Sequence, residues 1–217
     1  LNIAGEWQRL KEVIQEVHVP ITLEQVYPPT LEQLRRLIAN QQNNVVHFMG
    51  HGNQQKTGGE LLFEQEDGHV HAVTASDFVR CVRGAVFLVT LNSCVSATPG
   101  PDVFSNIAAS LMRQKTPYVL GMRFSIADED ARIFSRIFYS ELARGSSVEE
   151  AVLQVRLKLA QSECQWAIGV PVLYTALRTA ASGFLLAQGH PILEEHRPRM
   201  ESDVLPRVEG IYHGYRD

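Results

Sequence analysis

The sequence predicts an α/β fold with a mostly parallel central sheet and helices on both faces. Three short apolar runs, at residues 45–49, 85–91 and 118–122, are typical of strands that are buried on both sides. Segments with apolar residues at helical spacing separate these runs, and strands that alternate with helices form parallel sheets. At 217 residues the chain is long enough for one such domain, with a further segment left over.

The first 40 residues predict two helices and a strand. Residues 1–17 carry apolar side chains every three to four positions, the spacing of an amphipathic helix. Residues 17–26 are richer in β-branched side chains and predict a strand. Thr30, followed by Gln33 three positions later, matches a capping box and predicts a helix that begins there.

A hairpin and further helices are expected after the first central strand. Asp67 and Gly68 lie between two apolar runs, at 61–65 and 70–73, and an Asp-Gly pair suits a tight turn. Four more helices are expected, at residues 74–82, 103–112, 128–144 and 147–161.

The last part of the chain predicts an edge strand and a tail. Residues 166–177 are extended in character, and Pro171 within them favours an edge or a bulge. Residues 183–217 mix Pro, Gly, Glu and Arg with no helical or strand period. We therefore expect one domain over residues 1–180, and a linker or the start of a following domain over residues 181–217. The first residue is leucine, so we expect a fragment of a longer protein.

Composition excludes several classes of function. The net charge is −4 and basic residues are scattered, so no surface for nucleic acid is expected. No apolar run approaches the roughly 20 residues of a membrane span, and the chain starts without the pattern of a signal peptide. No phosphate-binding P-loop pattern is present. Three cysteines at wide spacing argue against a disulfide framework and for a reducing, cytoplasmic setting.

Two segments at the carboxyl ends of predicted buried strands carry candidate chemistry. His51 lies between two glycines just after the strand at 45–49, and Cys94 follows the strand at 85–91. In open α/β sheets, ligands and catalytic groups gather at these strand ends. If the two strands are neighbours, the two side chains emerge side by side although they are 43 residues apart.

A neighbouring imidazole and thiol suit nucleophilic catalysis. A thiol with a pKa near ~8.5 is only partly ionised at neutral pH, and an adjacent imidazole accepts its proton. An oxyanion that forms during the attack needs backbone N–H donors, and the amides of Gly52 and Cys94 are candidates.

Other cysteines and histidines have simpler interpretations. Cys81 and Cys164 are expected to be small buried side chains, and His47 a satisfied core residue that could alternatively touch the site. His69 and His71 alternate on a predicted strand; no third ligand stands at metal-motif spacing, so surface positions are favoured over a metal site.

Residues 47–52 (HFMGHG) and 91–94 (LNSC) resemble the two catalytic signatures of the CHAT domain, a family of caspase-like cysteine peptidases. The resemblance covers residues 1–177. Further matching segments lie at residues 59–63, 119–122, 138–152 and 166–174.

This resemblance implies a caspase-like three-layer sandwich and endopeptidase activity on a protein substrate. It gives His51 the role of general base and Cys94 that of nucleophile, with an oxyanion hole from the amides of Gly52 and Cys94. It requires no metal or organic cofactor. Relatives are usually fused to sensing regions, so regulatory domains of the parent chain or a partner protein are expected to control cleavage.

Three further residues near the predicted site have expected roles of their own. Asn92 stands where some relatives carry an acid that selects basic residues in the substrate, so that preference is not implied here. Asn92 and Arg123, each at a strand end, are expected to contact the substrate. Asp102 is expected to cap the helix at 103–112, with a reshaped cleft as the alternative.

Two other functions remain open at this stage. A catalytically silent domain could keep the fold as an interaction scaffold, although the retention of His51 and Cys94 argues against it. An amidase or acyltransferase is the other alternative. Such enzymes usually place a tight Gly-containing elbow after the nucleophile, whereas residues 95–102 include two prolines.

Overall fold

A central sheet organises the computed structural model, which describes residues 3–16, 22–40, 43–55, 58–92, 103–122, 128–162, 165–176 and 207–212. The described residues form six strands in the order β1-β9-β2-β6-β7-β8, and among them only β8 runs antiparallel to its neighbour. The strands are β1 (Thr22–Val26), β2 (Asn43–Met49), β6 (Leu88–Asn92), β7 (Tyr118–Met122), β8 (Pro171–Thr175) and β9 (Arg207–Tyr212). The mostly parallel sheet predicted from the sequence is confirmed.

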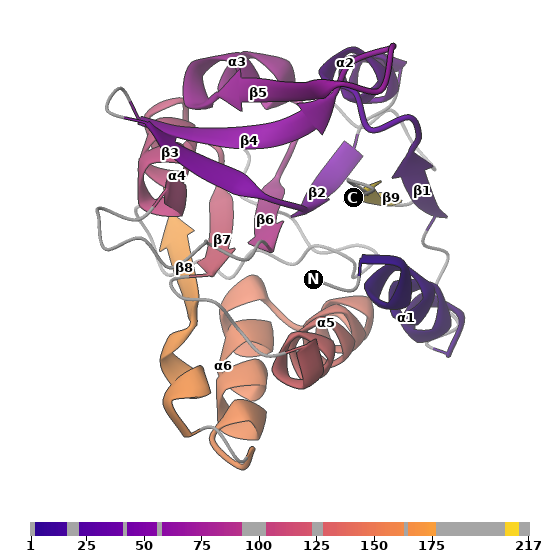
Figure 1. Cartoon of the computed structure of the whole chain (residues 1–217). Helices are drawn as coiled ribbons and strands as arrows, with labels where there is room; N and C mark the ends of the chain where they lie inside the picture. Colours follow the sequence, from indigo (N-terminus) through magenta and orange to yellow (C-terminus); the bar gives the residue numbers. More distant parts are fainter. Residues whose placement is uncertain are drawn as a thin grey trace.

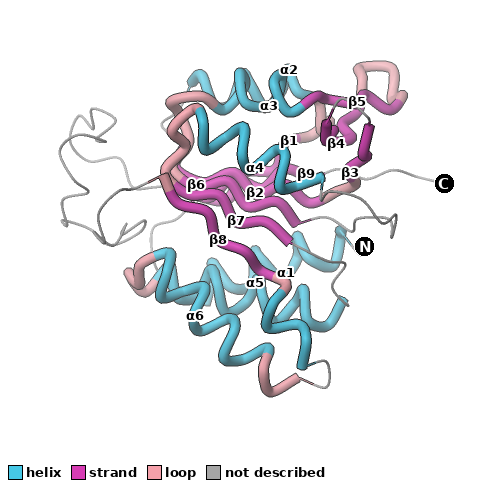
Figure 2. The backbone as a smooth tube through the Cα atoms, turned by 90° about the vertical axis from the view of Figure 1, so that its left-hand side faces the viewer, coloured by secondary structure: helices cyan, strands magenta, loops and turns pink. Residues whose placement is uncertain are grey.

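Helices cover both faces of this sheet, so the fold has three layers (Figure 1). Figure 2 shows one helical layer above the sheet and one below it. The first contains α2 (Leu31–Asn40), α3 (Ala75–Val82) and α4 (Val103–Arg113), and the second α1 (Ile3–Glu16), α5 (Asp128–Ala143) and α6 (Val148–Leu159). This arrangement is consistent with the three-layer sandwich expected from the sequence.

Side chains alternate between two cores because successive residues of a strand point to opposite faces. On β2, Val45 and Met49 pack with α1, α5 and α6, whereas Val46 and Phe48 pack with α2, α3 and α4. All four are fully buried. A strand buried on both faces accounts for the continuous apolar run in the sequence.

A second, antiparallel sheet follows β2 directly. It contains β3 (Gly52–Gln55), β4 (Gly58–Glu64) and β5 (Val70–Thr74), in that order. The β4–β5 hairpin was expected, and β3 was not. The sequence GNQQ has neither β-branched nor aromatic side chains, so β3 exists through its pairing with β4 rather than through its own propensity.

The tail contains a strand where none was expected. β9 lies between β1 and β2 and pairs in parallel with both of them. The expectation that residues 183–217 hold no regular structure is therefore wrong at 207–212. Backbone pairing on two sides stabilises a segment whose own sequence pattern is weak, since each ladder satisfies N–H and C=O groups. The domain boundary at residue 180 stays a prediction.

Two other strands are shorter than their apolar runs. The run at 85–91 yields β6 only from Leu88, because the amide of Ala85 bonds the carbonyl of Val82 at 3.3 Å and closes the turn that ends α3. The segment at 166–177 begins with a 3₁₀ helix, η1 (Gln165–Gly169). Pro171 opens β8 at the end of the strand order, which confirms the expected edge.

We predict that Ser147→Ala lowers the free energy of unfolding by about 1 kcal/mol. Ser147 caps α6: its hydroxyl accepts from the amide of Glu150 at 3.2 Å, and the Glu150 carboxylate accepts from the Ser147 amide at 2.9 Å. Urea denaturation measures the change. Glu129→Ala, which removes an ion pair with Arg132 on the exposed side of α5, serves as the control and should change it by less than ~0.5 kcal/mol. Equal effects of the two variants would contradict the capping account.

Candidate active site

The strands that lead to His51 and Cys94 lie next to each other in the sheet. β2 and β6 pair in parallel, with Met49 opposite Asn92. Beyond that pair, the amide of Gly50 donates to the carbonyl of Asn92 at 3.2 Å. In the sequence, His51 follows Met49 by two residues and Cys94 follows Asn92 by two residues, so the two candidates come equally far after the paired strand ends.

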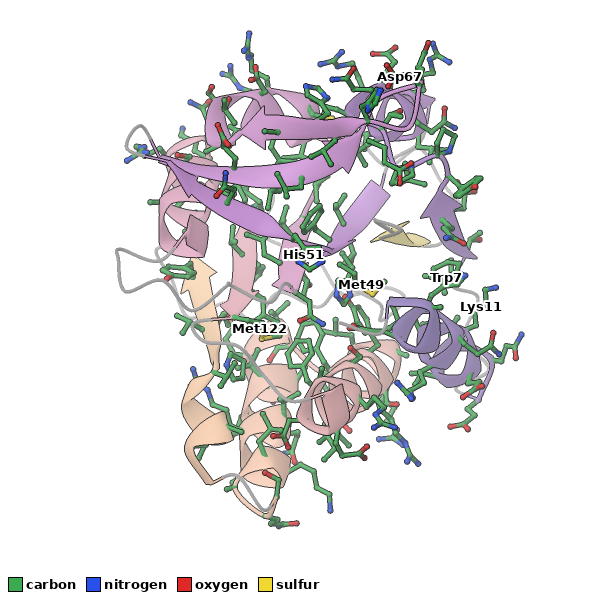
Figure 3. All side chains as sticks on the ribbon, in the orientation of Figure 1. Trp7, Lys11, Met49, His51, Asp67 and Met122 are labelled. Carbon is green, nitrogen blue, oxygen red and sulfur yellow. The ribbon has the colours of Figure 1, made fainter. Side chains whose placement is uncertain are left out.

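His51 stands at the junction of the two sheets. It follows the Met49 end of β2, directly before β3 begins at Gly52 (Figure 3). Its carbonyl accepts a hydrogen bond from the amide of Leu62 in β4 at 2.9 Å, and the residue is exposed. The second sheet thus holds the backbone of His51 and leaves the residue open to solvent, where an incoming chain could meet it.

Several expected site residues lie outside the described part of the chain. These are Cys94 and Arg123, together with Asp102 and Cys164. Their assigned roles stay predictions. Gly52 is described, at the start of β3, and its role as an oxyanion donor also stays a prediction.

Asn92, expected to contact the substrate, has a fully buried side chain. Its Nδ2 atom donates to Oε1 of Glu6 in α1 at 2.5 Å. Alternation along β6 places Asn92 on the face that α1, α5 and α6 cover, since Leu88 packs in that core. The amide therefore faces the protein interior in this structure.

The carboxyl group of Glu6 is buried next to the carboxyl ends of β2 and β6 and contacts several polar side chains. Glu6 is only 4% exposed. Its Oε1 atom accepts from Asn92 and also from the hydroxyl of Ser135 in α5 at 2.9 Å. Burying a carboxylate is costly unless hydrogen bonds compensate for the lost water, and these donors supply that compensation.

His47 extends this cluster and is neutral. Its Nδ1 atom lies 2.7 Å from the hydroxyl of Tyr139, and the two rings stack with centroids 5.5 Å apart. Complete burial lowers the pKa of His47 to about 3. The distance of 3.8 Å from its Nε2 atom to Oε1 of Glu6 is therefore not an ion pair at neutral pH. The expectation that His47 lies in the core is confirmed, but its Nε2 atom is buried with no hydrogen-bond partner among the described residues, so the histidine is satisfied only at Nδ1.

The proton positions in this cluster follow from the charges around it. We assign the Nε2–H tautomer to His47, because that N–H then faces the carboxylate of Glu6 while Nδ1 accepts from Tyr139. Burial also raises the pKa of the Tyr139 hydroxyl, so it stays protonated and able to donate.

The cysteine that the structure describes has a thiol unsuited to catalysis. Cys81 in α3 is 7% exposed, and burial raises the pKa of its thiol to about 11. This confirms the expectation of a small buried side chain. Within the described ranges, no group of three His, Cys, Asp or Glu side chains is arranged to hold a metal ion.

Glu6 is the residue that the sequence interpretation missed. It stands four positions before Leu10 and seven before Val13, both buried, so it occupies the apolar face of α1. A carboxylate at a core position of an amphipathic helix is the signal that could have found it. Its partner could not be found in this way, because Asn92 is 86 residues away in sequence.

Comparison with known proteins identifies one family. The family model of the CHAT domain matches residues 2–199. No curated protein matches the chain. Each helix in the described part of the chain is too short or too polar to cross a membrane.

We predict that the stability of the wild type falls more steeply with decreasing pH than that of His47→Gln. The folded state keeps His47 neutral down to about pH 3, whereas the unfolded state takes up a proton near pH 6.5. The free energy of unfolding contributed by this group is thus complete above pH 6.5. It is lost as pH falls toward 3, at up to about 1.4 kcal/mol per pH unit.

Urea denaturation between pH 7 and pH 4 measures the two slopes. His69→Gln, in the exposed turn of the β4–β5 hairpin, is the control and should keep the slope of the wild type. Parallel slopes for the wild type and His47→Gln would show that His47 is protonated in the folded state, against this account.

Proposed function

Because the chain belongs to the CHAT-domain family, we propose that it is a caspase-like cysteine endopeptidase with Cys94 as nucleophile and His51 as general base. The observation that carries the proposal is the in-register parallel pairing of β2 with β6, in which Met49 faces Asn92. Because of this pairing, the segments that carry His51 and Cys94 begin at the carboxyl ends of two adjacent strands. The exposure of His51 also supports it, since a peptide must reach the imidazole.

The proposed reaction proceeds through a thioester. The Sγ atom of Cys94 attacks the carbonyl carbon of the peptide bond and its proton passes to His51, which gives a tetrahedral oxyanion. The amides of Gly52 and Cys94 donate to that oxygen. The C–N bond then breaks as His51 gives its proton to the leaving amine. Water, deprotonated by His51, hydrolyses the thioester and releases the acid and the free thiol. His51 returns that last proton to the sulfur of Cys94, and no atom changes its oxidation state, so the reaction needs no redox cofactor.

The proposed substrate is a protein, with Arg123 contributing to its binding. Control by regulatory domains of the parent chain or by a partner protein is part of the proposal, as is a cytoplasmic location, where a reduced thiol persists. Asn92 is the exception among the expected substrate contacts. Its side chain faces the core, and we assign it a different role below.

We predict that a peptide library incubated with the wild-type protein contains cleavage products that are absent with Cys94→Ala. His51→Ala should lower kcat/KM for the best peptide by at least ~10²-fold, since it removes the general base. Cys81→Ala is the matched control, because it removes a thiol that is buried away from solvent, and it should cleave like the wild type. Mass spectrometry of the products measures all three.

Product patterns that are identical for the wild type and Cys94→Ala would contradict the enzyme proposal. The library is therefore also tested with the full-length parent protein, in which any activating region is present. Absence of cleavage there as well would favour the alternative, an interaction scaffold that keeps the fold without the reaction.

A further inference from the structure

Asn92 is attached to the structure on two sides at the point where the chain leaves β6. Its carbonyl accepts from the amide of Gly50, the residue before His51, at 3.2 Å. Its side-chain Nδ2 donates to Glu6 at 2.5 Å. Asn92 thus joins the end of the histidine strand, the start of the cysteine loop and helix α1 in one place.

The Glu6 contact is the one that orients the Asn92 side chain among the described residues. The other polar atom of the amide, Oδ1, is buried and has no hydrogen-bond partner in the described part of the chain. A buried polar group without a partner is costly, so a favourable bond elsewhere must hold the side chain in this rotamer. The carboxyl group of Glu6 provides it, because its Oε1 atom accepts from Nδ2 of Asn92.

Glu6 is itself held in position from a second helix. The hydroxyl of Ser135 in α5 donates to the same oxygen atom at 2.9 Å, and the Nε2 atom of His47 in β2 lies 3.8 Å from it. One carboxyl oxygen of α1 therefore accepts hydrogen bonds from α5 and β6 and lies close to β2. In a close-packed core, a displacement of either helix cannot leave this group unchanged.

We propose that Glu6 is a positioning residue for the nucleophile: through its hydrogen bond to Asn92 it fixes the end of β6 from which Cys94 departs. This inference rests on the proposed function, in which Cys94 must lie within reach of His51. It also gives α1 a role beyond packing, since a partner or neighbouring domain that shifts α1 would act on Cys94 by way of Glu6. It replaces the expectation that Asn92 contacts the substrate.

Two readouts separate positioning from stability. The first is the alkylation rate of Cys94 by iodoacetamide at neutral pH, mapped by mass spectrometry, which needs no substrate. The second is the division of the effect between kcat and KM for a cleaved peptide, since a misplaced nucleophile lowers kcat and leaves substrate binding intact. Each variant is first shown to be folded by its thermal unfolding midpoint.

We expect Glu6→Leu to lower kcat on the order of 10²-fold with KM unchanged, the effect of displacing a reacting group by about 1 Å. The alkylation rate of Cys94 should fall about 10-fold, toward that of an ordinary thiol. Glu6→Gln keeps an acceptor oxygen for Asn92 and should stay within about 3-fold of the wild type in both readouts.

An exchanged pair provides the rescue. Asn92→Asp alone places two carboxyl groups together in the core and should be as impaired as Glu6→Leu. Combining it with Glu6→Gln reverses the direction of the hydrogen bond and restores a donor opposite an acceptor. We expect the double variant to recover most of the lost alkylation rate. Ser147→Ala, the cap variant of α6, is the stability control and should keep the rates of the wild type.

The outcomes distinguish this inference from the proposed function. If Glu6→Leu is folded and alkylates and cleaves like the wild type, the inference is overturned while the peptidase proposal stands. If the wild type cleaves nothing, in the full-length parent protein as well, but Cys94 alkylation falls in Glu6→Leu and recovers in the double variant, the positioning role stands and the peptidase proposal falls. Equal loss in Glu6→Leu and Ser147→Ala would reduce the role of Glu6 to general stability and overturn the inference.

Discussion

The parallel pairing of β2 with β6 is the constraint on which the candidate site depends. In this register Met49 pairs with Asn92. One residue beyond the end of β2, the amide of Gly50 donates a hydrogen bond to the carbonyl of Asn92. A slip of one residue would turn every side chain of the strand to the other face and move the buried apolar residues of β2 out of their cores. The apolar core therefore enforces the register, and the register in turn places the carboxyl ends of β2 and β6 side by side.

A cluster of polar side chains is buried in the core next to the carboxyl ends of β2 and β6. The cluster around Glu6 takes side chains from two helices and two strands, and its members are buried among aromatic and aliphatic residues. Burial makes such a group sensitive to geometry, because a hydrogen bond lost there is not replaced by water. His47 is neutral in this setting because its complete burial removes the water that would stabilise an imidazolium, which lowers its pKa to about 3. Hydrophobic side chains of equal volume in place of this polar cluster could stabilise the fold as well. The presence of polar side chains is therefore best explained by the orientation that they impose on the end of β6.

The sequence predicts the parts of the fold that depend on local pattern. The apolar runs of β2 and β7, the Thr30 cap of α2, whose hydroxyl accepts from the Gln33 amide, and the apolar stripes of the helices are visible because each depends on neighbouring residues. Two strands were missed, β3 and β9, and both owe their structure to partners distant in sequence. The same reason hid the bond between Glu6 and Asn92. The adjacency of the strands that precede His51 and Cys94 could be expected, because the carboxyl ends of adjacent parallel strands lie together, and the pairing of β2 with β6 confirms it; the roles of the two residues stay predictions.

The central claim, that His51 and Cys94 share a proton, is tested most directly by the pH dependence of Cys94 alkylation in the wild type and in His51→Ala. The account predicts that the wild-type rate reaches half its maximum well below pH ~8.5, and that His51→Ala moves this midpoint upward to the ordinary thiol range. Cys81, buried and with a raised thiol pKa, should stay unmodified in both proteins while they are folded. Superimposable profiles for the wild type and His51→Ala would contradict the account, because they would show a thiol that does not sense the imidazole.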